Sequence, residues 1–337
     1  MIREAIEKVV AGNDLTRDEA AAVMEEIMTG LATPAQFGAL MTGLRLKGET
    51  VEEIVGFASV MRRLATSVSP SRPVVDTCGT GGDGRGTFNI STTAAFVAAG
   101  AGATVAKHGN RSMTSKCGSA DVLEALGVNI ALTAAQVETC LEEAGIGFMF
   151  AQLFHPAMKF AGGPRREIGI RTVFNILGPL TNPAGAHAQV LGVPSPALVP
   201  RMAEALALLG THHALVVCGD DGVDEISICA STCVSEVRDG EIRSYSVAPE
   251  DFGFARASLS DVLGGDAGAN AAITRAVLSG SDGPRRKVVL LNAAAALVAT
   301  DLADDLADGI RQAEKSIDSG AALGRLEKLT AVSKRFA

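Results

Sequence analysis

Apolar residues over the first 67 positions recur at every third or fourth place, which is the spacing of one face of an α-helix. This pattern predicts about four short helices. Three segments have the spacing of a capping box, in which a Thr and a Glu or Gln three residues later satisfy free amides at a helix start. They are TRDE at 16–19, TPAQ at 33–36 and TVEE at 50–53. The segment SVSPSRP at 67–73 interrupts the pattern with Pro and Ser, and it predicts a linker or hinge.

Beyond Pro73 the pattern changes to short apolar runs, glycine turns and helical segments in alternation. Strands are predicted at 73–77, 104–109, 146–151, 188–193 and 213–219, and helices at 91–100, 119–127, 133–145 and 195–210. Such alternation favours a mainly parallel sheet flanked by helices. Residues 232–247 differ, because alternating residues flank Asp239-Gly240, a strong signal for a hairpin turn. From about Ser258 the chain is predicted to be Ala-rich helix.

The predicted fold class is therefore α/β. A small N-terminal helical domain over residues 1–67 is expected to be hinged to a large α/β domain over 73–337, whose central sheet is mainly parallel and flanked by helices. Hydrophobic residues make up 47% of the 337 residues, and the mean hydropathy is +0.25. This composition indicates a globular chain with a sizeable core.

Composition also excludes several classes of partner. A net charge of −8, the absence of Trp and a single Tyr argue against nucleic-acid binding. The longest apolar run, 288–299, contains Asn292 and is shorter than the about 20 residues that a membrane helix needs. The start of the chain lacks the apolar core of a signal peptide, and the six cysteines form no CxxC motif. We therefore expect reduced thiols, a cytoplasmic protein and no membrane partner.

The segment CGTGGDGRGTFNIST at 78–92 carries five glycines within eight positions, between a predicted strand and a predicted helix. It contains a literal GxGxxG at Gly79, Gly81 and Gly84, which suggests a dinucleotide-binding loop. Two features oppose that interpretation: the helix does not start at the third glycine, and no acid follows the second strand. The Walker pattern fails as well. Such a loop favours backbone amides that approach a phosphate over a merely flexible connection.

Charge is unevenly distributed along the chain. Neither 84–120 nor 144–166 contains an Asp or Glu. The basic residues in these windows are Arg85, Lys107, Arg111, Lys116, Lys159, Arg165 and Arg166. In a chain with an acidic excess, this distribution predicts a local positive field that suits a small polyanionic ligand.

Other candidate residues allow two interpretations each. Ser91 and Thr92 open a predicted helix and either cap it or help to bind a second anionic group. Asp224 and Glu225 follow a strand and either lie on the surface or hold Mg²⁺ beside a polyphosphate. His155 is either packed or functional, and the apolar segment 171–185 is either a substrate wall or core.

Five segments carry a resemblance to a known family: CGTGGDGRGTFNIST at 78–92, KHGNRSMTSKCGSADVLEALG at 107–127, FAQLFHPAMK at 150–159, GIRTVFNILGPLTNPAG at 169–185 and DGVDEIS at 221–227. The chain resembles the anthranilate phosphoribosyltransferase family of the nucleoside-phosphorylase-like (class IV) phosphoribosyltransferases from about residue 1 to 330. The resemblance implies a homodimer formed through the helical domain, with helices from about 166–185 packing on that domain. It also implies Mg²⁺-dependent transfer of the phosphoribosyl group of phosphoribosyl pyrophosphate (PRPP) to the amine of anthranilate. The products are N-(5-phosphoribosyl)anthranilate and pyrophosphate, and the pathway is L-tryptophan biosynthesis.

The family's functional residues fall on defined positions of this sequence. The implied PRPP contacts are Gly79, Gly82, Asp83, Thr87, Asn89, Ile90, Ser91, Thr92, Lys107, His108, Gly109, Asn110, Arg111, Ser112, Met113, Thr114, Ser115 and Ser119. The implied anthranilate contacts are Gly79, Asn110 and Arg165, and the implied magnesium ligands are Ser91, Asp224 and Glu225, with two Mg²⁺ per subunit. The reaction needs no protein nucleophile. No residue is assigned as a dedicated base, and His108 and His155 are the candidates.

The sequence departs from the family pattern at Gln152, where Pro is expected, at SMTSKC (112–117) and at ASTC (230–233). None of these departures removes an implied ligand. The alternatives are a pyrimidine nucleoside phosphorylase of the same fold, a dinucleotide-dependent oxidoreductase and a noncatalytic relative that binds nucleic acid. KHGNR, GPLTNPAG and DGVDE favour the anthranilate enzyme, the missing acid opposes the oxidoreductase, and the net charge opposes the nucleic-acid binder.

Overall fold

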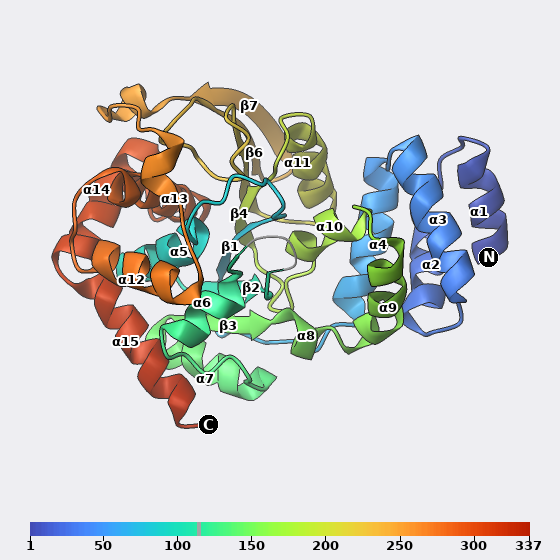
Figure 1. The fold of residues 1–337 in the computed structure, drawn as a ribbon, viewed down its shortest axis with the longest axis horizontal. Helices are drawn as coiled ribbons and strands as arrows, with labels where there is room; N and C mark the ends of the chain where they lie inside the picture. Colours follow the sequence, from blue (N-terminus) through green and yellow to red (C-terminus); the bar gives the residue numbers. More distant parts are fainter. Residues whose placement is uncertain (113–115) are drawn as a thin grey trace.

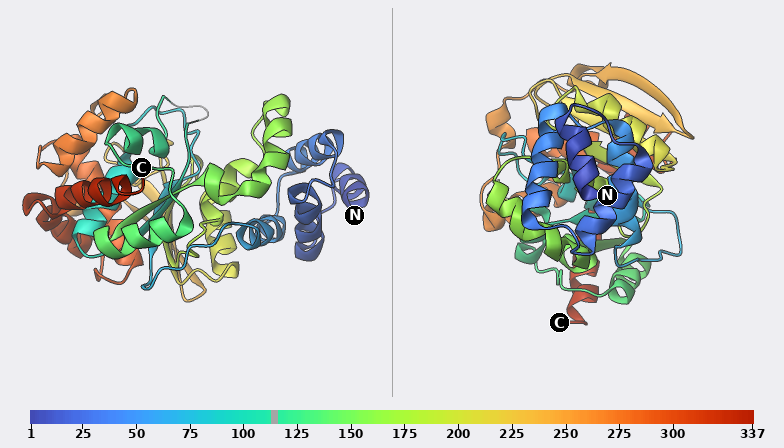
Figure 2. Two further views of the ribbon diagram at one scale, coloured as in Figure 1. Left: turned by 90° about the horizontal axis from the view of Figure 1, so that it is seen from below. Right: turned by 90° about the vertical axis from the view of Figure 1, so that its right-hand side faces the viewer.

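Four helices form the N-terminal end of the chain, as the apolar pattern predicts. They are α1 (Ile2–Val10), α2 (Arg17–Met28), α3 (Pro34–Lys47) and α4 (Val51–Arg63). The three capping boxes are confirmed at Thr16, Thr33 and Thr50, each with both reciprocal hydrogen bonds. The computed structural model describes residues 1–112 and 116–337, and these helices lie at one end of an elongated molecule (Figure 1 and Figure 2).

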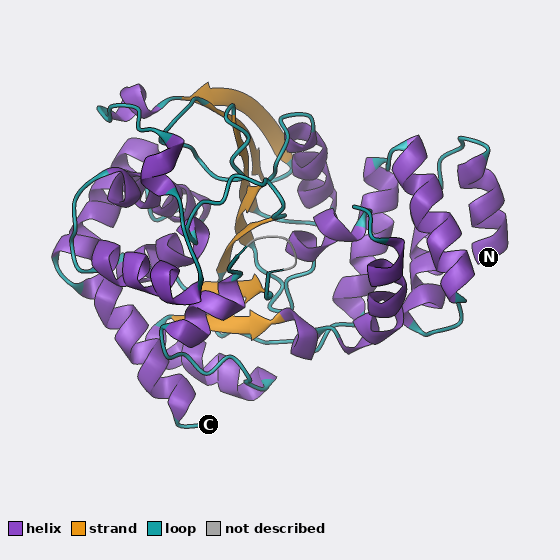
Figure 3. Ribbon diagram, viewed as in Figure 1, coloured by secondary structure: helices purple, strands orange, loops and turns teal. Residues whose placement is uncertain are grey.

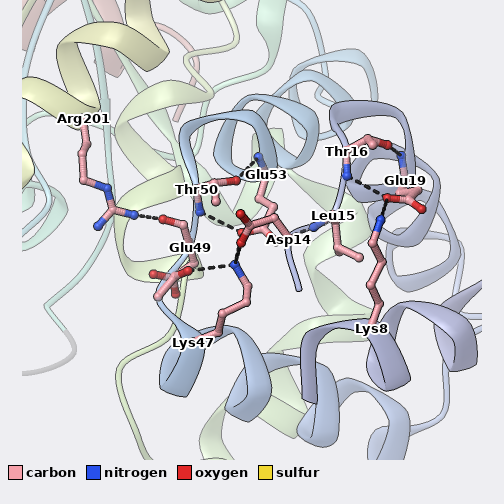
Figure 4. Close-up of polar contacts among 11 residues, drawn as sticks. Lys8, Asp14, Leu15, Thr16, Glu19, Lys47, Glu49, Thr50, Glu53 and Arg201 are labelled. Carbon is pink, nitrogen blue, oxygen red and sulfur yellow. Dashed lines mark hydrogen bonds and ion pairs between the residues drawn. The ribbon is translucent and has the colours of Figure 1, made fainter. Parts of the chain in front are cut away.

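Glu53, in the first turn of α4, is fully buried at the centre of this helical end (Figure 4). Its Oε1 accepts a hydrogen bond from the Leu15 amide at 2.9 Å. Its Oε2 accepts from the Thr50 amide at 2.7 Å and from Lys47 Nζ at 3.0 Å. One carboxylate therefore joins the α1–α2 connection, the end of α3 and the start of α4.

Hydrogen bonds also tie the helical end to the rest of the chain. Arg201 of α11 (Leu198–Leu208) donates to the carbonyl of Glu49 (Figure 4). Just before the predicted linker, the Thr66 amide donates to the Phe154 carbonyl at 2.8 Å, and within the linker the Val68 amide donates to the Pro183 carbonyl at 3.1 Å. The linker is therefore held to the α/β part at its first residues.

Among the described residues, seven strands form one sheet in the order β3-β2-β1-β4-β5-β6-β7 (Figure 3). The strands are β1 (Val75–Gly79), β2 (Val105–Gly109), β3 (Ile146–Phe150), β4 (Ala188–Gly192), β5 (His213–Gly219), β6 (Thr232–Arg238) and β7 (Glu241–Val247). Neighbours among β1 to β5 pair in parallel, and β6 and β7 add an antiparallel hairpin that turns at Asp239-Gly240. Both the mainly parallel sheet and the hairpin are confirmed.

The other helices connect the strands or cover the sheet. They are α5 (Ile90–Gly100), α6 (Ser119–Ala125), α7 (Ala134–Ala144), α8 (Ala151–Phe154), α9 (Lys159–Ile168), α10 (Phe174–Leu177), α12 (Ala267–Leu278), α13 (Pro284–Ala299), α14 (Leu306–Asp318) and α15 (Ala321–Lys334). The last four confirm the helical C-terminal part. In the portion that the structure describes, no helix is long and apolar enough to cross a membrane.

Alternate residues of the strands enter two different cores, because successive side chains point to opposite faces of a sheet. Leu215 and Val217 of β5 pack in one core with α5 and α13. Val216 and Cys218 pack in a second core with α11 and with α1 to α4. The second core also contains buried residues of 173–180, and α9 lies against α2 and α3 (Figure 1). One face of the sheet is thus continuous with the helical end.

Candidate active site

Four parallel strands end in glycine at the same edge of the sheet. They are Gly79 of β1, Gly109 of β2, Gly192 of β4 and Gly219 of β5. An added Cβ at these positions would overlap atoms of loops that fold back over the strand ends, namely those of Asp224, Ser119 and Asp221. Since only glycine leaves this space, the loops lie directly on the carboxyl edge, where α/β sheets bind their ligands.

The glycine-rich loop between β1 and α5 has an unusual backbone. Gly81, Gly82, Gly84 and Gly86 have φ between +67° and +74°, a region that residues with a side chain seldom adopt. The Gly81 amide donates to Asp224, but among the described residues no acceptor is present for the amides of residues 82–84. Consecutive free amides in such a loop form a concave site for an anion. The geometry fits the phosphate loop that the sequence predicts.

Two buried carboxylates lie against this loop. Asp224 Oδ2 accepts from the Gly81 amide at 3.0 Å, and Glu225 Oε1 accepts from the Ser91 amide at 3.0 Å. Burial and then the charge of Asp224 raise the pKa of Glu225 to about 8. Burial and then the charge of Asp83 raise the pKa of Asp224 to about 6. The charged forms of both acids are therefore disfavoured here, and a bound cation would stabilise them.

The donor set fits Mg²⁺ that is completed by substrate and water oxygens. The buried Oδ2 of Asp83 has no hydrogen-bond partner among the described residues, and Asp83 lies close enough to raise the pKa of Asp224. In the described ranges, no three His, Cys, Asp or Glu side chains converge as a ready metal site. Mg²⁺ commonly takes one or two carboxylates together with phosphate oxygens and waters, which matches this arrangement.

Lys107 is the middle residue of β2. Its side chain is buried, and Nζ donates to the Thr77 carbonyl and to Ser91 Oγ, the latter at 3.5 Å. Asp76 is buried nearby and accepts from Asn182 Nδ2 at 2.7 Å. Burial raises the pKa of Asp76 to about 6, and the charge of Lys107 opposes that rise. Lys107 is thus a buried cation that contacts the first turn of α5.

The remaining predicted PRPP contacts on this loop differ in exposure. Ile90 and Thr92 are buried, each with 1% of its surface exposed. Asn89 Nδ2 donates to the carbonyl of Cys117 at 3.3 Å. Thr87 forms an isolated antiparallel bridge with Leu263. The structure therefore brings these residues to the same edge, and several already serve the fold there.

The loop between β2 and α6 holds a second group of predicted contacts. Ser119 Oγ donates to the Asn110 carbonyl at 3.3 Å, directly beside Gly109. Arg111 is not a free cation, because its guanidinium pairs with Asp121 and Glu124 of α6. These two pairs raise the pKa of Arg111. Ser112 donates its amide to Asp121 at 3.2 Å. The calls at Met113, Thr114 and Ser115 lie outside the described residues.

His108 and His155 form a buried pair whose ring centroids lie 5.0 Å apart. In each ring Nε2 is buried and has no hydrogen-bond partner among the described residues. Burial lowers the pKa of His108 to about 3 and that of His155 to about 4. Both imidazoles are therefore neutral at pH 7, and each has a buried ring nitrogen whose hydrogen-bonding capacity is unused among the described residues.

Arg165, near the end of α9, lies beside an apolar segment. Its guanidinium is half-buried, 5.2 Å from the ring centre of Phe174, and it forms no ion pair with any described residue. Burial lowers the pKa of Arg165. The apolar side chains of 173–180 are largely buried in the second core, so that segment is core more than exposed wall. Arg165 is a partly desolvated cation that fits a small carboxylate ligand.

Comparison with known proteins decides the family. Residues 71–323 match the a/b domain of a glycosyl transferase family, and residues 3–65 match the helical bundle domain of that family. Curated relatives include anthranilate phosphoribosyltransferases of Chloroflexus aggregans, 65% identical over 99% of this chain and 98% of the relative, and of Roseiflexus sp., 63% identical over the same shares. The chain belongs to the anthranilate phosphoribosyltransferase family.

Solved structures of anthranilate phosphoribosyltransferases agree with this membership. The Thermus thermophilus enzyme has a TM-score of 0.93 and 44% identity, covering 98% of this chain and 99% of its own. The Saccharomyces cerevisiae enzyme in complex with PRPP and Mg has a TM-score of 0.90 and 30% identity, covering 99% and 98%. The resemblance drawn from the five motifs is confirmed, and the oxidoreductase and nucleic-acid alternatives lose their support.

One residue of this anthranilate phosphoribosyltransferase site was not predicted from sequence. Arg171, between α9 and α10, donates to the carbonyls of Gly82 at 2.7 Å and Gly81 at 3.0 Å. The sequence marks this segment by its apolar residues, and Arg171 stands two positions after Gly169 with no further local signal. Nothing local indicates that this side chain reaches a loop about 90 positions earlier in the sequence.

Proposed function

We propose that this chain transfers the phosphoribosyl group of PRPP to the amine of anthranilate in L-tryptophan biosynthesis. The products are N-(5-phosphoribosyl)anthranilate and pyrophosphate. The observation that carries the proposal is the meeting of the free amides of residues 82–84 with the buried acids Asp224 and Glu225 at one sheet edge. A pyrophosphate ester with its divalent cation requires both kinds of group together.

Asp224, Glu225 and Ser91 would hold Mg²⁺, which when bound neutralises charge on the pyrophosphate oxygens as a Lewis acid. The raised pKa values of the two acids support this role. The unpartnered Oδ2 of Asp83 supports a second ion, so we propose two Mg²⁺ per subunit. Family relatives from yeast were solved with Mg, and one of them with PRPP as well.

The chain itself contributes fixed electrostatic groups to the departure of pyrophosphate. Negative charge grows on the leaving group while positive charge grows on the sugar ring. The free amides of residues 82–84 are held by the loop and need no reorganisation when that charge appears. Lys107 adds a buried positive charge next to Ser91. These groups bind the leaving anion, and the remaining contribution is the positioning of two substrates.

The anthranilate side of the site is built from Arg165, Asn110 and the histidine pair. Arg165 has no ion-pair partner among the described residues, so it is available to bind the carboxylate of anthranilate. His108 and His155 are weak bases because burial lowers their pKa to about 3 and 4. We infer that they accept a hydrogen bond from the amine and orient it, and that the proton is lost after the new bond forms.

We also propose a homodimer that forms through the helical end. Three large apolar side chains are strongly exposed there: Val10 by 70%, Leu31 by 74% and Leu46 by 83%. Covering such side chains with a second copy of the chain would remove them from water, which favours association. Size-exclusion chromatography with light scattering tests this, because Leu46→Glu should give monomers and Leu302→Glu, on the far part of the chain, should not.

A cytoplasmic location is likewise proposed. Cys78, Cys140, Cys218, Cys229 and Cys233 are free thiols, as in a reducing compartment. Fractionation of the source cells would test it.

The activity is tested by following anthranilate fluorescence with purified protein, PRPP and Mg²⁺. The signal should fall only when all three are present, and pyrophosphate should appear in equal amount. A constant signal from folded protein would overturn the proposal. Uridine or thymidine with phosphate would then be tried, because a pyrimidine nucleoside phosphorylase shares the fold.

A further inference from the structure

Arg171 contacts the glycine-rich loop through two backbone carbonyls. NH1 donates to the Gly82 carbonyl at 2.7 Å, and NH2 donates to the Gly81 carbonyl at 3.0 Å. The guanidinium lies so close that a Cβ at Gly82 would come within 2.7 Å of NH1. Among the described residues Arg171 forms no ion pair, so both of its recorded partners are loop carbonyls.

These two bonds determine where the next amides point. In a trans peptide the C=O of one residue and the N–H of the next point in opposite directions. The carbonyls of Gly81 and Gly82 face Arg171, so the amides of Gly82 and Asp83 must face away from it. Those amides lack an acceptor within the described ranges. Arg171 therefore orients two of the free donors without lying among them.

The loop needs such a restraint because its composition leaves the backbone loose. Gly81 and Gly82 have φ of +67° and +74°, yet glycine adopts the mirror conformation almost as easily. If either peptide turned over, a carbonyl oxygen would replace an amide and repel a phosphate. A cation that binds both carbonyls disfavours that reversed state, since hydrogen bonds to a charged group are stronger than neutral ones.

Arg171 also joins two parts of the molecule. The residues that follow it, Val173 and Phe174, are buried in the core shared with the helical end. The Thr172 amide donates to Asn175 Oδ1 at 2.9 Å, which holds the backbone beside Arg171. Arg165 lies on the helix just before it. Arg171, which orients the loop amides, thus follows the helix that carries Arg165, the cation proposed to bind anthranilate.

We propose that Arg171 is a positioning residue for PRPP, which holds the glycine-rich loop with its amides directed toward the pyrophosphate. The proposal rests on the proposed function. It assigns to Arg171 no contact with substrate, so its loss should weaken PRPP binding through the shape of the loop while the loop sequence stays intact.

The experiment compares Arg171→Ala and Arg171→Lys with Arg166→Ala. Arg166 is an exposed arginine of α9 that has no polar partner among the described residues. Arg171→Ala should raise the KM for PRPP about tenfold or more, because two charged hydrogen bonds are lost. The KM for anthranilate should change less than about threefold, and the thermal midpoint should stay near that of the wild type. Arg171→Lys should restore part of the PRPP affinity, since one ammonium can reach a carbonyl.

Two further measurements separate positioning from a general structural role. Guanidinium ion at millimolar concentration should restore PRPP use by Arg171→Ala and leave Arg166→Ala unaffected. An unchanged KM for PRPP, an equal rise of both KM values, or no rescue would overturn the proposal. Direct PRPP binding, measured by calorimetry, tests the role of Arg171 separately from the proposed function. If wild-type protein binds PRPP but does not consume anthranilate, anthranilate is not the acceptor. Weaker binding by Arg171→Ala in that assay still supports the role of Arg171, and equal binding refutes it.

Discussion

The Oδ2 atom of Asp224 accepts a hydrogen bond from the Gly81 amide at 3.0 Å, across 143 positions of sequence. This bond joins the acidic loop after β5 to the glycine-rich loop after β1. It is possible because Gly79 and Gly192, paired across β1 and β4, have no side chains where Asp224 lies. The proposed cation site and the proposed phosphate site are therefore parts of one structure, and a change in either should affect both.

Gly192→Ala should disrupt this contact. Its Cβ would overlap the backbone of Asp224, which cannot rotate away as a side chain can. We expect a loss of about 1–3 kcal/mol in the free energy of unfolding, as for other overpacked sites, together with weaker Mg²⁺ binding. Urea unfolding measures the change in stability, and calorimetry measures Mg²⁺ binding. Gly324→Ala in α15, where an added Cβ meets nothing within 4 Å, is the control and should be neutral or slightly stabilising. Equal effects from both variants would contradict the account.

Mg²⁺ affinity should depend on pH. Burial and Asp224 raise the pKa of Glu225 to about 8, so the protonated fraction of this carboxyl grows as the pH falls below about 8. Mg²⁺ must displace that proton. The Kd for Mg²⁺ should therefore rise by up to about tenfold for each pH unit as the pH falls from 8 to 6. Titration calorimetry with MgCl₂ at several pH values measures this. In Glu225→Gln the affinity should be weaker and its pH dependence smaller, and a flat wild-type profile would refute the assignment.

Arg165→Ala should raise the KM for anthranilate much more than the KM for PRPP. The half-buried guanidinium has no carboxylate partner among the described residues, so its removal leaves the anthranilate carboxylate without a counter-ion. Loss of a charged pair of this kind predicts that the KM for anthranilate rises by about ten- to a hundredfold. Initial rates with each substrate varied in turn provide the comparison. Arg166→Ala serves as the neighbouring control, and a similar rise of both KM values would exclude the role.

Glu53→Ala should strongly destabilise the helical end. It leaves the amides of Leu15 and Thr50 without an acceptor and Lys47 without its buried partner. We expect the free energy of unfolding to fall by about 3–5 kcal/mol, which is the usual cost of removing one partner of a buried ion pair. Glu52→Ala is the matched control, because Glu52 pairs with Arg17 at the surface and should contribute less than about 1 kcal/mol. Thermal unfolding distinguishes the two, and similar midpoints would contradict the prediction.

Much of the fold and part of the site were predictable because their signals are local. The capping boxes at Thr16, Thr33 and Thr50 involve residues three apart, and the hairpin at Asp239-Gly240 needs only neighbouring positions. The glycine-rich loop was also evident from composition, since its positive φ values at Gly81 and Gly82 demand glycine. The five motifs then led to the correct family.

Charge is the clearest case in which sequence alone misleads. Arg111 lies in a window without acids and was counted toward a positive field, yet Asp121 and Glu124 pair with it from the next helix. Arg165, by contrast, forms no ion pair among the described residues, and neither does Arg171. Net local charge depends on which side chains meet, and a count along the chain does not contain that information.

By itself, then, the sequence determined the helices, the strands, the loop that demands glycine and the family. These properties depend on residues within one or two turns of each other, where spacing fixes geometry. The tertiary structure alone decided that Asp224 binds Gly81 and that Arg171 holds the carbonyls of Gly81 and Gly82. These contacts join positions about 90 to 143 apart. The Asp224 contact exists because the parallel strands bring their carboxyl ends to one edge and leave glycine there.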